Sequence, residues 1–204
     1  AFVTAVKKRF PHVLLQWEDF AQQNANPILE KYRDELCTFN DDIQGTAAIA
    51  TGTLLSAVQA TGTPLHAHRI AVLGGGSAGC GISNLLKEAL MEDGLSEEEA
   101  RSRFFIVDRN GLLVEGATGL MPFQEKFLQP KSAVANWTCA NPNNITLLDV
   151  IKNIHPTVLV GVSGQAGVFT EEIVREMASH VERPVIFPLS NPTSHSEATP
   201  TQLM

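Results

Sequence analysis

Short apolar runs alternate along this chain with longer segments whose apolar residues recur at helical spacing. Such runs, bounded by glycine, proline or acidic residues, are typical of buried strands, and the longer segments predict helices. Strands that alternate with helices predict an α/β fold with a doubly wound, mostly parallel sheet. We expect strands at 12–17, 37–39, 69–73, 104–107, 157–162 and 184–189. We expect helices at 2–9, 24–36, 43–60, 82–91, 147–155 and from 170 onward.

Local signals refine several of these elements. Asn24 can cap the second helix. Ser96 and Glu99 have the spacing of a capping box, which predicts a short surface helix before the fourth strand. Residues 111–145 carry the weakest pattern of the chain, and we expect a helical turn at 122–127 and loop elsewhere.

Composition narrows the class of protein. The chain has 204 residues, a net charge of −7 and 44% apolar residues, which suits one folded domain with a full core. The acidic balance without a basic cluster argues against nucleic acid as a partner. No apolar run approaches the roughly 20 residues of a membrane span. Three widely spaced cysteines form neither a disulfide framework nor a zinc pattern, so we expect a reducing, cytoplasmic compartment.

One stretch, 69–108, contains a strand, a glycine-rich turn, a helix, a second strand and an acid. Its motif glycines, in G-x-G-x-x-G spacing, are Gly74, Gly76 and Gly79. The first permits a tight turn, the second lets backbone approach a pyrophosphate, and the third lets the helix pack on the strand. Backbone amides at the start of the helix that follows can hold phosphates. The motif alone also occurs in flexible loops, but its flanking elements favour a Rossmann-like dinucleotide site.

Asp108 ends the second strand of this unit and can accept hydrogen bonds from the hydroxyls of an adenosine ribose. It follows Gly79 by more than the usual spacing of about 20 residues. An acidic insertion at 92–103 accounts for the excess. Arg109 could instead face a 2′-phosphate. We therefore predict NAD, with NADP as the alternative.

Two pairs of acids, Glu18-Asp19 and Asp41-Asp42, follow the first two predicted strands. Because the carboxyl ends of parallel strands meet at one edge of a sheet, we expect all four beside the glycine turn. Together they would repel one another strongly unless a cation intervened. All-oxygen ligands suit Mg²⁺ or Mn²⁺ rather than zinc. The alternative is that each pair is a solvated turn or a helix cap, as Asp42 ahead of Ile43 could be.

A divalent cation beside a nicotinamide suggests a hydroxy acid whose oxidation leaves a β-keto acid. The cation would polarise the new carbonyl and stabilise the enolate left by loss of CO₂. Ser163-Gly164 and Asn191 follow the last two predicted strands, so we expect them at the same edge.

Several segments together resemble the malic enzymes, in particular their bacterial-type, NAD-linked branch. The segment FNDDIQGTA, which begins at Phe39, is the most specific, and the others are 13–20, 74–81, 161–164 and 189–193. The resemblance covers essentially the whole chain as the family's NAD-binding domain. It implies oxidative decarboxylation of L-malate to pyruvate and CO₂ with NAD and Mn²⁺ or Mg²⁺. Two alternatives are a malolactic enzyme, which forms lactate and keeps its NAD, and a non-catalytic dinucleotide-binding domain.

The resemblance also implies roles for individual residues. Glu18, Asp19 and Asp42 match the three carboxylates that bind the metal. Asp41 matches the acid that partners the family's catalytic lysine, and Asn191 matches an amide that contacts malate beside the nicotinamide. The cofactor-binding residues that the resemblance implies are Gly74, Gly76, Ser77, Ala78, Gly79, Asp108, Val162, Ser163, Gly164 and Asn191.

Other groups of the family's site are expected outside residues 1–204. The catalytic tyrosine and lysine, and an arginine that holds the substrate, come from a domain that would precede Ala1. We therefore expect 1–204 to be one domain of a longer enzyme, inactive alone, and the full-length enzyme to be a homo-oligomer. Gln124 falls near the position where NADP-dependent members carry a lysine, which again favours NAD.

Three further residues could be taken for site residues. We expect His195 to be a solvated loop histidine and Cys80 to be a small residue in a tight turn. We expect Tyr32, the only tyrosine, to serve in packing.

Overall fold

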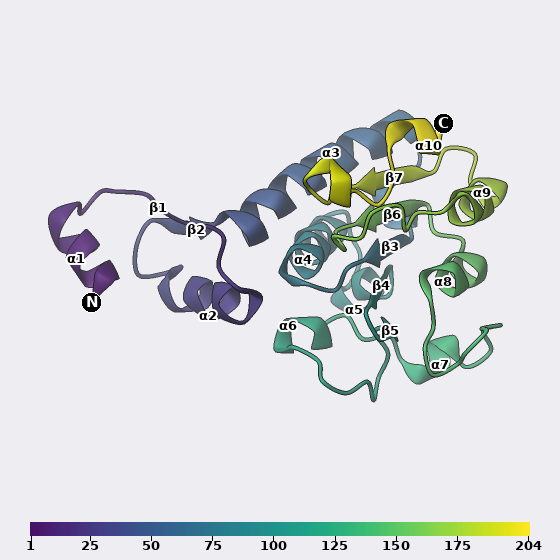
Figure 1. Ribbon diagram of the computed structural model, residues 1–204, viewed down its shortest axis with the longest axis horizontal. Helices are drawn as coiled ribbons and strands as arrows, with labels where there is room; N and C mark the ends of the chain where they lie inside the picture. Colours follow the sequence, from purple (N-terminus) through teal and green to yellow (C-terminus); the bar gives the residue numbers. More distant parts are fainter.

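A central sheet of five strands organises the molecule (Figure 1), in the order β5-β4-β3-β6-β7. The computed structural model describes the backbone of residues 1–204 and every side chain except that of residue 22. Strands β4, β3, β6 and β7 are parallel, and β5 is an antiparallel edge strand, so the predicted doubly wound, mostly parallel sheet is confirmed. The strands are β1 (Leu15–Trp17), β2 (Thr38–Asn40), β3 (Ile70–Leu73), β4 (Phe104–Asp108), β5 (Gly111–Leu112), β6 (Val158–Gly161) and β7 (Val185–Pro188).

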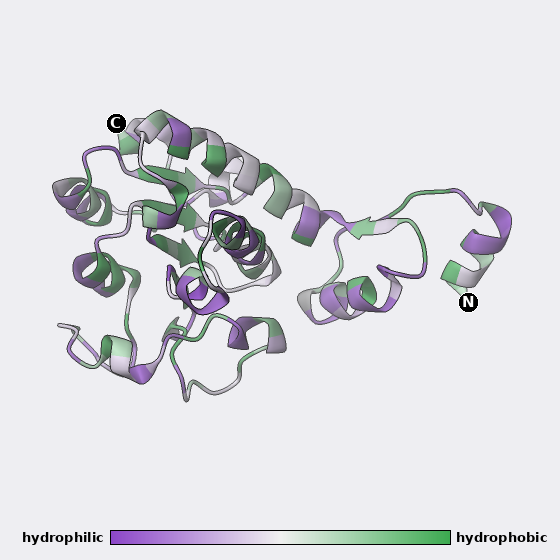
Figure 2. Ribbon diagram, turned by 180° about the vertical axis from the view of Figure 1, so that it is seen from behind, coloured by the Kyte–Doolittle hydropathy of each residue, from purple (hydrophilic) through white to green (hydrophobic). Residues whose placement is uncertain are grey.

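Helices cover both faces of the sheet. They are α1 (Phe2–Arg9), α2 (Gln22–Tyr32), α3 (Thr46–Thr61), α4 (Ser77–Glu92), α5 (Glu97–Arg101), α6 (Pro122–Glu125), α7 (Lys131–Val134), α8 (Leu147–Ile154), α9 (Glu171–His180) and α10 (Pro200–Leu203). Alternate strand residues point to opposite faces. Ile70 and Val72 of β3 therefore pack in one core cluster with α3 and α4, and Ala71 packs in another with α8 and α9. Figure 2 shows apolar residues concentrated on the strands and on the helix faces turned toward them.

Helix α4 begins at Ser77, five residues earlier than its sequence pattern predicts. Gly79 and Gly81 lie in its first turns, and because glycine has a low helix propensity, the sequence pattern did not predict a helix there. Packing against the strand and against neighbouring backbone overrides that propensity. The predicted capping box is confirmed, because Ser96 and Glu99 cap each other's backbone N–H groups at the start of α5.

The segment from α1 to β2 extends to one side of the body of the molecule (Figure 1). Strands β1 and β2 pair with each other in a separate parallel sheet of two strands. The expectation that their acids would lie at the edge of the central sheet was therefore wrong. The cap of α2 is Ala21, so the expectation of an Asn24 cap was also wrong. A π-helical turn, Asp41–Gly45, connects β2 to α3.

The region 111–145, where the sequence pattern is weakest, contains short elements. The predicted turn near 122 is helix α6, but β5 and α7 were not predicted because each has only two or four residues. Such lengths give no readable periodicity. Within the described residues, no helix has the length and apolar character needed to cross a membrane.

Candidate functional site

The glycine turn joins β3 to α4 at the carboxyl edge of the sheet. Gly74 has a φ of 113°, which glycine adopts without strain. A Cβ on Gly74 would lie 2.5 Å from the Val162 carbonyl oxygen, and a Cβ on Gly79 would overlap the Gly74 carbonyl oxygen. The turn is therefore as tight as the motif predicts. It places the first amides of α4, at Ser77 and Ala78, at this edge, and the first N–H groups of a helix have no acceptor within it.

Asp108 ends β4 beside the glycine turn and is held by Gln124. The Gln124 side-chain amide donates to Asp108 Oδ2 and to the Gly75 carbonyl oxygen, at 2.8 Å each. Its own oxygen accepts the Met121 N–H at 2.8 Å, and Gln124 is buried. Among the described residues, Asp108 Oδ1 has no hydrogen-bond partner. The pair therefore presents an oriented carboxylate oxygen, which is the group that a ribose hydroxyl needs.

The loops after β6 and β7 adjoin the same edge. Val162 N–H donates to the Leu73 carbonyl oxygen at 2.9 Å, which joins the end of β6 to the end of β3. Gly164 N–H donates to Ser190 Oγ at 2.9 Å, so the loop that carries Ser163 and Gly164 contacts the loop that carries Asn191. The structure thus brings together loops on separate strands whose residues were predicted to bind the cofactor.

Sequence reasoning missed Glu197, which lies in the core of this loop pair. Its carboxylate accepts hydrogen bonds from both Ser163 and Ser190, and the residue has no exposed surface. No spacing rule points to an acid within an irregular segment. The one available signal was an acid in a stretch otherwise poor in charge.

The two acid pairs lie side by side at the ends of β1 and β2. The register pairs Trp17 with Asn40, so the residues that follow each strand are also neighbours. Asp19 N–H donates to Asp42 Oδ2 at 2.9 Å. The cap of the following turn is Asn40, whose side chain accepts the Ile43 N–H, so Asp42 is not the cap.

The donor chemistry of these acids fits a hard divalent cation, because all are carboxylates on neighbouring strand ends. Glu18 is turned aside, with its Oε2 accepting from Gln16 Nε2 at 2.8 Å. Within the described part of the chain, no three acidic, histidine or cysteine side chains form a cluster that could hold a metal. The structure therefore brings Asp19 and Asp42 together but not Glu18, and the metal assignment stays a prediction.

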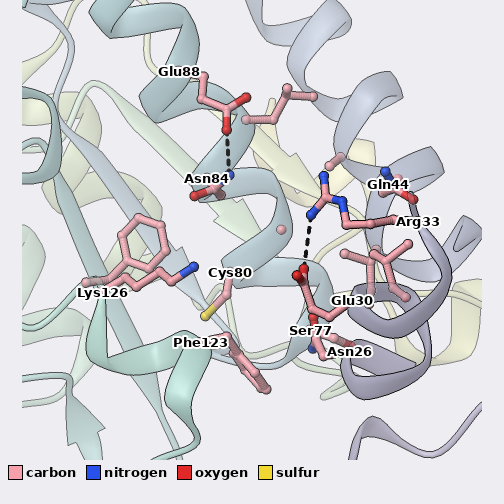
Figure 3. Close-up of a pocket in the computed structure, with 16 residues that line it drawn as sticks. Asn26, Glu30, Arg33, Gln44, Ser77, Cys80, Asn84, Glu88, Phe123 and Lys126 are labelled. Atoms are coloured by element: carbon pink, nitrogen blue, oxygen red, sulfur yellow. Dashed lines mark hydrogen bonds and ion pairs between the residues drawn. The ribbon is translucent and has the colours of Figure 1, made fainter. Parts of the chain in front are cut away.

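The acidic turn nevertheless lies against the helix of the dinucleotide motif. A Cβ on Gly81 of α4 would lie 3.0 Å from the Ile43 carbonyl oxygen, so a larger residue would have to push the turn back by a few tenths of an ångström. A cavity of about 380 Å³ opens here between α2, α3, α4 and α6 (Figure 3). Ser77 and Gln44 both line it. The cavity thus extends from the first turn of α4 to the turn that carries Asp41 and Asp42.

The residues that the sequence analysis set aside have packing roles or weak contacts. Burial, with a smaller contribution from the charge of Asp108, raises the pKa of the Cys80 thiol to about 12, so the thiol stays protonated. Tyr32 stacks on Trp17 at 5.8 Å between ring centroids, as expected for a packing residue. His195 is exposed and contacts the Gly164 carbonyl oxygen through Nδ1 at 3.2 Å.

Two family descriptions match this chain. Residues 43–204 match "Malic enzyme, NAD binding domain", and residues 1–33 match "Malic enzyme, N-terminal domain". The NAD-dependent malic enzyme of Pectobacterium carotovorum is 55% identical over 203 residues, which are 100% of this chain and 36% of that protein. The NAD-dependent malic enzyme of Shewanella sp. strain ANA-3 is 56% identical over 204 residues, again 36% of its length. The chain thus spans 36% of the length of these curated relatives.

Solved structures share the fold. The malic enzyme of Entamoeba histolytica superposes with a TM-score of 0.77 at 21% identity and covers 99% of this chain and 38% of its own. The NAD-dependent malic enzyme of Thermotoga maritima superposes with a TM-score of 0.74 at 24% identity and covers 99% of this chain and 48% of its own. By the match of residues 43–204 to the family's NAD-binding domain, this chain belongs to the malic enzyme family.

Proposed function

We propose that this chain is the cofactor- and metal-binding part of a longer enzyme that converts L-malate to pyruvate and CO₂ and reduces NAD. One observation carries the proposal. Asp108, the glycine turn, the loop with Ser163 and the loop with Asn191 follow β4, β3, β6 and β7, which are successive neighbours in the sheet, so all four lie along its carboxyl edge. The curated relatives support it, since those of 55–56% identity are named NAD-dependent malic enzymes.

The chain's own residues would bind the dinucleotide in an extended form. Asp108 would accept the adenosine ribose hydroxyls, and the amides of Ser77 and Ala78 would hold the pyrophosphate. The loops that carry Ser163 and Asn191 would receive the nicotinamide end. When bound, NAD supplies a hydride acceptor. The negative charge of Asp108, bonded to the neutral Gln124, disfavours a 2′-phosphate and so favours NAD over NADP.

Glu18, Asp19 and Asp42 would hold Mn²⁺ or Mg²⁺. The cation supplies Lewis acidity that stabilises negative charge developing on a substrate oxygen. Asp41 would orient a lysine from a part of the enzyme outside residues 1–204. Asn191 would contact malate beside the nicotinamide.

Metal binding can be tested on the chain itself. Titration calorimetry with Mn²⁺ should give a binding heat that Asp42→Ala abolishes and that Asp34→Ala, a change to an exposed acid after α2, leaves in place. The absence of any Mn²⁺ heat, with or without NAD, would contradict the metal assignment and favour a pure dinucleotide-binding domain.

The chain alone should show no malic enzyme turnover. Its one tyrosine, Tyr32, is packed on Trp17. The catalytic tyrosine and lysine that would transfer protons are expected outside residues 1–204. The assay follows NADH at saturating malate and Mn²⁺, first with residues 1–204 and then with the full-length enzyme. Turnover by the purified chain would contradict this assignment of roles.

The full-length enzyme distinguishes the two decarboxylation outcomes. Pyruvate formed in step with NADH supports the proposal, and lactate without net NADH would identify a malolactic enzyme instead.

We also propose a cytoplasmic homo-oligomer. The three free cysteines support the compartment. The exposed Phe2, Phe10 and Leu14 on the segment from α1 to β2 support further packing, against the rest of the enzyme or a second copy.

A further inference from the structure

Glu197 is a buried carboxylate that joins the loops after β6 and β7. Its Oε1 accepts hydrogen bonds from Ser163 N–H at 2.8 Å, Ser163 Oγ at 2.7 Å and Ser190 Oγ at 2.6 Å. Its Oε2 accepts the Ser190 N–H at 3.3 Å. The same Ser190 Oγ accepts the Gly164 N–H at 2.9 Å. One side chain therefore fixes the backbone on both sides of the loop contact.

The surrounding residues are shaped around this carboxylate. A Cβ on Gly161 would lie 2.6 Å from Glu197 Cδ, so the end of β6 must be a glycine. The Glu197 carbonyl oxygen accepts the Phe169 N–H at 3.0 Å, which anchors the segment that carries it. Glu197 is thus held at both its backbone and its side chain.

The charge of Glu197 is balanced by hydrogen bonds alone. Among the described side chains, no lysine, arginine or histidine forms an ion pair with it. Burial by itself would raise the pKa of Glu197, but the hydrogen bonds from Ser190 and Ser163 outweigh burial and hold the pKa below its ordinary value. An uncompensated buried carboxylate is costly, so its four donors must stay in place around it.

We propose that Glu197 is a positioning residue for the nicotinamide end of the dinucleotide site. It holds Ser163-Gly164 and the Ser190-Asn191 backbone in the arrangement that receives the nicotinamide ribose and ring. The inference rests on the proposed function. The adenosine end uses the glycine turn and Asp108, on other strands, so loss of Glu197 acts on one half of the cofactor.

The test compares NAD⁺, which has both halves, with ADP, which lacks the nicotinamide half. Glu197→Ala leaves the N–H groups of Ser163 and Ser190 without their acceptor. By calorimetry it should raise the Kd for NAD⁺ about tenfold and that for ADP less than about twofold. Glu197→Gln keeps one oxygen for three of the donors, so it should return the Kd for NAD⁺ to within about threefold of the wild-type value.

A matched control removes a hydrogen-bond cluster at the opposite end of β6. Thr157 Oγ1 contacts His68 Nδ1 at 2.9 Å and accepts the Arg69 N–H at 3.0 Å at the amino edge of the sheet. Thr157→Val should lower the thermal midpoint and leave the Kd values for both nucleotides unchanged.

Equal weakening of NAD⁺ and ADP by Glu197→Ala, or no weakening of either, would overturn the positioning role. If that variant does not fold, Glu197→Gln decides, because its NH₂ group cannot accept the Ser190 N–H. An increase of about two- to threefold in the Kd for NAD⁺ with an unchanged Kd for ADP supports the role, and an equal change for both nucleotides or no change overturns it. A wild-type chain that binds neither nucleotide would contradict the proposed function and this role with it.

Discussion

At the scale of single residues, the proposed preference for NAD over NADP rests on the pair Asp108 and Gln124. The neutral amide of Gln124 donates to Asp108 Oδ2 and is buried. The pair therefore carries the negative charge of the Asp108 carboxylate and no positive charge to balance it. A 2′-phosphate would meet the carboxylate without a cation beside it. We therefore predict that this pair disfavours NADP.

Gln124→Lys should raise the affinity for NADP relative to NAD by about tenfold, since a cation beside Asp108 is worth on the order of 1.4 kcal/mol toward a phosphate. The measurement is the ratio of the two Kd values by fluorescence titration. The control is Gln59→Lys, the same change on an exposed residue of α3, which should leave the ratio unchanged. An unaltered ratio for Gln124→Lys would show that this pair does not select the cofactor.

At the scale of elements, helices α3 and α4 contain glycines with opposite roles. Gly52 of α3 has no atom within 4 Å of the position of a Cβ. Gly81 of α4 lies against the Ile43 carbonyl oxygen, where a Cβ would be 3.0 Å away. The first glycine only weakens its helix, and the second lets the acidic turn approach the dinucleotide motif.

Gly52→Ala should therefore increase the free energy of unfolding by about 0.5–1 kcal/mol, the cost of glycine in a helix interior. Gly81→Ala gains the same propensity but crowds the turn, and it should decrease that free energy by about 1 kcal/mol or more. Urea denaturation of both variants measures the difference. A stabilised Gly81→Ala variant would mean that the contact between turn and helix is loose.

At the scale of the whole molecule, the sequence predicted the central sheet and the residues at its carboxyl edge. The apolar runs of β3, β4 and β6 are almost wholly buried, and β7 is buried at Val185 and partly buried beyond it, so the pattern of all four is readable. Their order brings the glycine turn, Asp108 and Ser163 together, as the rule for parallel sheets requires.

The remaining features depend on contacts distant in sequence. Strands β1 and β2 have three residues each, and nothing in so short a pattern tells whether they join the main sheet or pair alone. The bonds from Gln124 to Asp108 and from Glu197 to Ser163 link irregular segments, where no periodicity reports a neighbour. Their partners are set by tertiary packing.

The central claim is that a dinucleotide lies along the carboxyl edge of the five-stranded sheet. Amide chemical shifts of the ¹⁵N-labelled chain during titration with NAD⁺ test it most directly. The predicted result is a set of shifts concentrated at Gly74–Gly79, Asp108, Val162–Gly164 and Asn191. Shifts confined to the amino edge, around Thr63, His68 and Thr157, or no shifts at saturating NAD⁺, would contradict the account.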